Sequence, residues 1–214
     1  MNELLAHTDR EITGILETLS NDEWSHPSLC SEWTIREVAL HLASVNVAPV
    51  AYSARRLLAH GGNLNRANLD VVAHLDATLT NDELIRVIAA NAGRHRRIGR
   101  LLPPPFMLGD HVIHLLDIAV PLRREPALQP EALRRVLQTQ LRVPNPFVPA
   151  ARFGRGIHFD ATDIDWQSAD APLSVSGTGA DIALTLAGRT AAMHRLEGTG
   201  ADTLATRVER WRLQ

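Results

Sequence analysis

Two histidines and two aspartates fall within one short apolar stretch, GDHVIHLLDI, at residues 109–118. On a helix, Asp110 and His114 project from the same face because they are four residues apart. Side chains at this spacing can bind one metal ion, as histidine pairs four residues apart bind zinc. Asp117 continues the same face, where it could orient a ligand or contact a substrate. An acid and a histidine four residues apart are common by chance. The alternative is therefore an ordinary helix edge without a metal, unless another part of the chain supplies a third ligand.

A third ligand could come from His41, in the stretch EWTIREVALHL at residues 32–42. Thr34 and Glu37 have the spacing of a reciprocal capping box, and Trp33 is placed for a hydrophobic staple across this helix start. His41 lies on the flank of an apolar stripe formed by Ile35, Val38, Leu42 and Val45. Two imidazoles and a carboxylate would leave coordination positions open for water or substrate. The alternative is a core-edge histidine that is hydrogen-bonded to a backbone carbonyl.

Two further residues, His111 and Cys30, could also bind a metal or react, but a structural role is the simpler expectation for each. His111 projects about 100° away from Asp110 around a helix, so we expect an interior or surface histidine that is only a reserve ligand. Cys30 precedes the second helix, whose positive end could lower a thiol pKa, but a packing residue is the simpler expectation. It is the sole cysteine, which excludes an internal disulfide and fits a reducing cytoplasm.

The elements that must position these side chains can be read from apolar periodicity. The pattern predicts a helix ending near residues 20–22, one from Thr34 to about His60 with a bend near Pro49, and others over about 65–77, 80–100, 107–122 and from Pro130. A proline- and glycine-rich stretch at 143–156 predicts a linker, and strand character follows it. We therefore expect a helical domain over 1–143 and a small α+β domain over 150–214.

Composition excludes several classes of partner and chemistry. The net charge is −2, which gives no reason to expect nucleic acid or an anionic membrane as a partner. All 22 basic residues are arginine, so Schiff-base catalysis by lysine is excluded. No apolar run approaches the ~20 residues that span a bilayer, and the N-terminus does not have the pattern of a signal peptide. We expect a cytoplasmic protein that is a monomer or homodimer.

Several stretches together resemble one family. PSLCSEWTIREVALHLAS resembles the helix start of the DinB-like superfamily, and LGDHVIHLLDIAVPL is similar to a segment of the mycothiol-dependent maleylpyruvate isomerase family. FDATDIDW, VSGTGADIALTLAGR and LEGTGADTLATRV resemble its C-terminal domain. The resemblance implies a mostly α fold of class α+β, in which a DinB-like four-helix bundle precedes a small sterol-carrier-protein-like domain. It also implies a divalent metal, usually zinc, on His41, Asp110 and His114.

The resemblance also implies a chemistry. A thiol, mycothiol in this family, adds to the double bond of an unsaturated diacid, the adduct rotates, and the thiol leaves. The family's isomerase has glutamate where this sequence has Asp110, so the shorter arm must draw the helix nearer to the ion or weaken the site. Arg189 and Arg195 are candidates to bind an anionic substrate or the cofactor.

The function that we expect is metal-dependent isomerisation or S-transfer on a small electrophilic substrate with a low-molecular-weight thiol. The first alternative is a hydrolase or lyase that acts through metal-bound water without a thiol. The second is a non-catalytic, ligand-binding bundle. The joint presence of His41, Asp110 and His114 without an evident fourth protein ligand favours an open, catalytic site over a scaffold.

Overall fold

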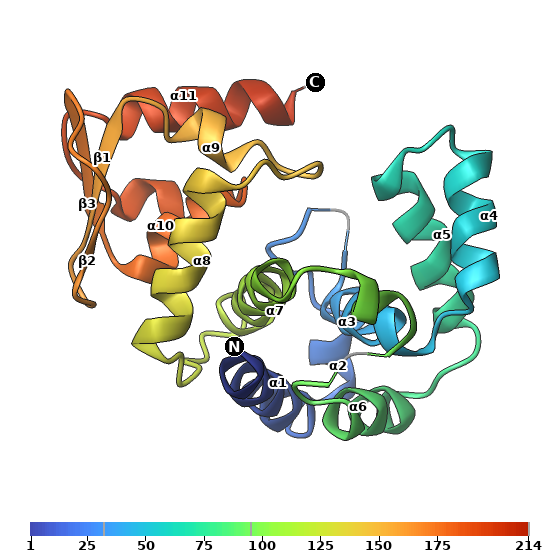
Figure 1. Cartoon of the computed structure of the whole chain (residues 1–214). Coiled ribbons are helices and arrows are strands. Elements are labelled where there is room, and N and C mark those ends of the chain that lie inside the picture. The colour runs from blue at the N-terminus through green and yellow to red at the C-terminus, as the bar shows by residue number, and fades with distance from the viewer. Residues whose placement is uncertain (32, 95, 214) are drawn as a thin grey trace. The chain divides into compact units, whose positions relative to one another are not determined.

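The computed structural model describes residues 1–31, 33–94 and 96–213. Its packing divides the chain into two compact units, Met1–Ala127 and Leu128–Gln214, which are drawn in Figure 1. The first unit is helical, and the second combines helices with a small sheet. The expected class, α+β with a predominance of helix, is confirmed. Among the described residues no helix combines the length and the apolar character that a membrane crossing needs.

The first unit is built around a bundle of α1, α3, α6 and α7. Its elements are α1 (Asn2–Leu16), α2 (Asn21–Trp24), α3 (Ile35–Val47), α4 (Val50–Ala59), α5 (Leu64–Asp76), α6 (Asn81–Ala90), the 3-10 helix η1 (Arg97–Leu101) and α7 (Pro104–Ala119). Helix α7 packs on α1 and α3, while α4 and α5 pair beside α3 (Figure 1). The core side chains of the bundle have apolar character in common, and they include Ile12, Leu16, Val38, Leu42, Leu84, Leu108, Val112 and Leu115.

Local capping signals set where the helices begin. The predicted capping box at α3 is confirmed: the backbone amide of Thr34 donates to Glu37 Oε2 at 2.7 Å, and the amide of Glu37 donates back to Thr34 Oγ1 at 3.3 Å. The same reciprocal pair opens α6, from Thr80 to Glu83. Each box satisfies amides that the first helical turn leaves without partners.

Four predicted helix boundaries are wrong. The first helix, expected to end near residues 20–22, ends at Leu16, and Ser20 caps a separate short helix. The helix expected from Thr34 to His60 is two helices, because Ala48 has an extended backbone and Pro49 begins a new helix. The helix expected over 80–100 ends at Ala90, and η1 follows it. Gly93 takes a left-handed φ of +66° there, and a Cβ on Gly93 would come within 2.7 Å of α1. Helix α7 begins at Pro104, three residues earlier than expected, because proline suits the first turn.

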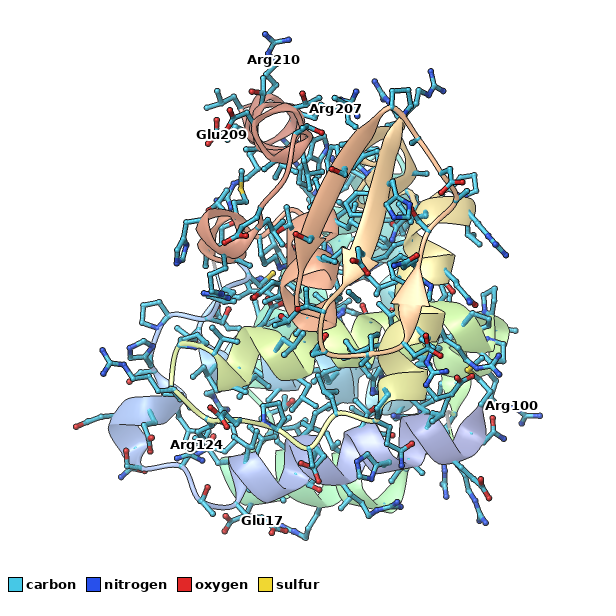
Figure 2. All side chains as sticks on the ribbon, turned by 90° about the vertical axis from the view of Figure 1, so that its left-hand side faces the viewer. Glu17, Arg100, Arg124, Arg207, Glu209 and Arg210 are labelled. Carbon is cyan, nitrogen blue, oxygen red and sulfur yellow. The ribbon has the colours of Figure 1, made fainter. Side chains whose placement is uncertain are left out.

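The second unit packs helices on a three-stranded sheet. Its elements are α8 (Pro130–Arg142), α9 (Ala150–Phe153), β1 (Ile157–Ala161), β2 (Trp166–Gln167), β3 (Leu173–Gly177), α10 (Gly179–Leu186), η2 (Thr190–Arg195) and α11 (Ala201–Arg212). The strand order is β2-β1-β3, with β1 antiparallel to β2 and parallel to β3. Ile157, Phe159 and Val175 face the core. The carbonyls of Phe153 and Arg155 accept hydrogen bonds from Arg207 of α11, which Figure 2 labels.

The division by packing differs from the boundary read from the sequence. The sequence places the boundary between 143 and 150, whereas packing places it after Ala127. The difference is α8, which packs against α9 and α10. Gln140 of α8 donates a hydrogen bond to the carbonyl of Ala183 in α10 at 2.9 Å. The proline-rich stretch that follows α8 is thus an internal loop of the second unit.

The end of α7 is tied back to the start of the chain. Arg124 donates hydrogen bonds from its guanidinium to the carbonyl of Ile15 at 3.1 Å and to Glu23 Oε1 at 2.9 Å. Figure 2 labels Arg124 near the corner where α1 gives way to α2. The segment that leaves α7 is therefore fastened to α1 and α2.

Candidate metal centre

The three residues that the resemblance assigns to a metal lie together in the first unit. His41 Nε2 and His114 Nε2 lie 3.5 Å and 3.6 Å from Asp110 Oδ1. Ligand atoms of all three lie within 4.8 Å of one another, and the two imidazole centroids are 4.9 Å apart. The structure thus brings together side chains that are about seventy residues apart in sequence, as one metal ion requires.

Two helices produce this arrangement. Asp110 and His114 are one turn apart on α7, and His41 comes from α3, which packs against α7. The capping box of α3 sets where that helix begins, and its apolar face turns His41 toward α7. The side chain of Asp110 keeps a third of its surface exposed, whereas that of His114 keeps 9%. The carboxylate therefore lies on the solvent side of the cluster.

The charges in the cluster favour an ionised carboxylate. Burial opposes the ionisation of Asp110, but the protonated forms of His41 and His114 and a hydrogen bond from His41 outweigh it and hold the Asp110 pKa well below its usual range. A carboxylate must be deprotonated to bind a metal ion. Asp110 is therefore ready to act as a ligand at neutral pH.

Asp117 is the buried hydrogen-bond partner of His114. Asp117 Oδ2 lies 2.9 Å from His114 Nδ1, and Asp117 is fully buried. A proton on Nδ1 that is donated to this carboxylate leaves the lone pair on Nε2, the nitrogen that faces Asp110. The carbonyl of Asp117 also accepts a hydrogen bond from the amide of Leu29 at 3.1 Å, which fastens the loop before α3 to α7.

Unlike His114, His41 is positioned by ring packing and not, within the described part of the chain, by a hydrogen bond at Nδ1. Its Nδ1 is buried and has no hydrogen-bond partner among the residues that the structure describes. Its ring packs instead on Trp33, with centroids 5.0 Å apart, and Trp33 also lies 6.1 Å from the ring of His114. Sequence reasoning gave Trp33 only a packing role at the helix start. Its position directly before a capped helix that carries His41 is the signal that could have placed it beside the cluster.

His111 points to a different partner. Its Nδ1 lies 2.5 Å from Asp9 Oδ1, and Asp9 Oδ2 accepts a hydrogen bond from the amide of Gly93 at 2.8 Å. Burial disfavours the charged imidazole, but the Asp9 carboxylate outweighs it and raises the pKa of His111. Adjacent residues diverge by about 100° on a helix, so fixing His111 toward α1 also fixes the direction of its neighbour Asp110.

The two arginines proposed to bind an anion lie in the second unit. Arg195 donates from Nε and Nη2 to Asp181 Oδ1 at 2.9 Å and 2.5 Å, and this hydrogen bond raises its pKa. Arg189 donates to the carbonyl of Ala187 at 2.8 Å. Arg195 therefore already has a carboxylate partner within its own unit, and the binding role of both arginines stays a prediction.

Comparison with known proteins finds a matching family model and two similar solved structures. A family model described as the mycothiol maleylpyruvate isomerase N-terminal domain matches residues 5–142. Two crystal structures are similar, one of the mycothiol-dependent maleylpyruvate isomerase and the other of a histidine-to-alanine mutant of it. Each has 17% sequence identity and a TM-score of 0.56, and each match covers 94% of this chain and 92% of the other. No curated protein matches the chain.

Proposed function

The chain belongs to the mycothiol maleylpyruvate isomerase family, and from this premise we propose that it is a divalent-metal enzyme that uses a low-molecular-weight thiol. The thiol is mycothiol, and the reaction is cis–trans isomerisation or S-transfer on a small, electrophilic, anionic substrate. The observation that carries the proposal is the convergence of His41, Asp110 and His114 within 4.8 Å. The fully buried Asp117 behind His114 supports it.

The donor set suits zinc. Two imidazoles and one carboxylate are nitrogen and oxygen ligands of the kind that catalytic zinc sites use, and three protein ligands leave a position open. The buried hydrogen bond between Asp117 and His114 is the outer support that metal-binding histidines have. When bound, the ion would lower the pKa of a coordinated thiol and polarise a carbonyl.

The residues of the chain have separate tasks in this scheme. His41 and His114 offer Nε2, and Asp117 keeps the proton of His114 on Nδ1. Asp110 supplies a negative charge that offsets part of the charge of the ion. Trp33 packs against the ring of His41, and its apolar surface keeps water from that side of the site.

The reaction needs no net oxidation or reduction. The external thiolate forms a carbon–sulfur bond with the activated alkene, which leaves a carbanion stabilised by the neighbouring carbonyl. Rotation about the resulting single bond changes the geometry, and the carbon–sulfur bond then breaks to return the thiolate. Asp110 is one methylene shorter than the glutamate of the family's isomerase, so we assign the substrate only as an unsaturated carboxylate.

Metal content and thiol dependence test this proposal. We expect about one zinc per chain, and we expect His41→Ala and His114→Ala to lose it. The matched control is His194→Ala, an exposed histidine in the second unit. Turnover of an unsaturated dicarboxylate should require mycothiol. Full zinc retention in both cluster variants would reject the ligand set, and equal turnover without thiol would favour the hydrolase or lyase alternative.

A further inference from the structure

The imidazole of His114 meets a second group of metal-binding side chains. Ligand atoms of Cys30, His114 and Asp117 lie within 4.8 Å of one another. The Nε2 edge of the ring faces Asp110, whereas the Nδ1 edge faces Asp117 at 2.9 Å. One histidine therefore belongs to two groups of three potential ligands, and it lies next to Asp110 through Nε2 and next to Asp117 through Nδ1.

The second group is anchored in the fold. Asp117 and His114 are buried, and Cys30 is half-buried in the loop between α2 and α3. The hydroxyl of Ser28 donates to the carbonyl of Cys30 at 3.1 Å, and the amide of Leu29 donates to the carbonyl of Asp117. The first bond tightens the loop around Cys30, and the second fastens that loop to α7. Cys30 is the most exposed residue of the group.

We propose that Cys30, Asp117 and the Nδ1 edge of His114 form a second cation position that is selective for thiophilic ions such as Cd²⁺. A thiolate is a soft ligand, and the first group has only imidazole and carboxylate donors. Binding at the second position releases the thiol proton of Cys30 and takes the place of the hydrogen bond between His114 and Asp117. This assignment does not depend on the chemistry proposed above.

The shared imidazole couples the two positions, and this part of the inference rests on the proposed zinc site. A neutral imidazole has one nitrogen with a free lone pair and one that carries a proton. An ion on Nε2 needs the proton on Nδ1, where Asp117 accepts it, whereas an ion on Nδ1 needs the proton on Nε2. As long as the imidazole is neutral, the two positions exclude each other, and a thiophilic ion on Nδ1 inhibits the enzyme because it requires the His114 tautomer with the proton on Nε2.

Cadmium titration of the His41→Ala variant tests the second position after the first position has lost one of its ligands. Because Cys30 is the sole cysteine, any thiolate-to-cadmium charge-transfer band in the near ultraviolet comes from it. We expect the band to saturate at about one equivalent of Cd²⁺. Adding Cys30→Ser should abolish it, and adding Asp117→Asn should weaken binding by about tenfold or more. Circular dichroism checks the fold, and Asp117→Ser replaces Asp117→Asn if that variant does not fold.

Two results would overturn the proposed second position. The first is the absence of the charge-transfer band in folded His41→Ala protein at saturating Cd²⁺. The second is an unchanged cadmium affinity after Asp117 is replaced, because this would indicate binding by the thiol alone. Zinc added first to the wild-type chain should suppress the band. A full band with zinc still bound would overturn the exclusion. Failure of the proposed zinc site has a separate signature, because the zinc affinity would then be the same in the wild type and in His41→Ala.

Discussion

Replacement of Asp117 by asparagine is the most direct test of how the cluster is supported. Asp117 is fully buried, and its Oδ2 accepts the hydrogen bond from His114 Nδ1 at 2.9 Å. Asparagine has nearly the same volume, but its amide can donate to Nδ1, which would move the proton of His114 to Nε2 and block the ligand nitrogen. Loss of such an outer partner lowers metal affinity by about 10- to 100-fold, which corresponds to about 1.4–2.7 kcal/mol.

The assay separates metal affinity from folding. Zinc affinity is measured by competition with a chromophoric chelator, and the free energy of unfolding of the metal-free protein is measured in urea. The matched control is Asp181→Asn, which removes another buried carboxylate with an ionic partner, Arg195, in the second unit. We expect both variants to lose stability and only Asp117→Asn to lose zinc affinity. Wild-type zinc affinity in folded Asp117→Asn would refute the orienting role of this carboxylate.

Three further predictions follow from the same unit. The pKa of His111 is raised in the folded state, so its pair with Asp9 should contribute its full stabilisation below about pH 6.5. This stabilisation should be lost as the pH rises through the raised pKa. The free energy of unfolding in urea, measured across this range, should therefore fall in the wild type and not in Asp9→Asn. Gly93→Ala should destabilise the chain by about 2–4 kcal/mol, because it combines a left-handed φ with a 2.7 Å clash. Gly61 is also left-handed but lies in open space, so Gly61→Ala should cost about 1 kcal/mol. Equal losses of unfolding free energy in the two variants would contradict the clash. Co²⁺ bound at the cluster should quench the fluorescence of Trp33, whose ring adjoins both histidines, and Trp33→Phe should remove most of that quenching.

Features that depend on neighbours in sequence were predictable. The capping box from Thr34 to Glu37 involves atoms only three residues apart, so its signal survives without knowledge of the fold. The shared face of Asp110 and His114 follows from helix geometry alone. The strand character after the proline- and glycine-rich stretch and the mostly helical class are likewise local properties, and the structure confirms them.

Boundaries that depend on distant contacts were not predictable. The break after α6 at Ala90 occurs where Gly93 meets α1 and its amide binds Asp9, a residue more than eighty positions away. The helical pattern continues past this point in the sequence, and only the contact with α1 shows why the helix stops. Helix α8 has an amphipathic pattern that fits either unit, and only its packing on α10 assigns it to the second.

The sequence by itself determined which residue types could bind a cation and which two of them share a helix face. Tertiary structure alone decided that His41 of α3 meets them and that Cys30 of the loop before α3 comes within 4.8 Å of the ligand atoms of His114 and Asp117. The reason is physical: periodicity fixes the direction of a side chain around its own helix, whereas the distance between two helices is set by the side chains packed between them.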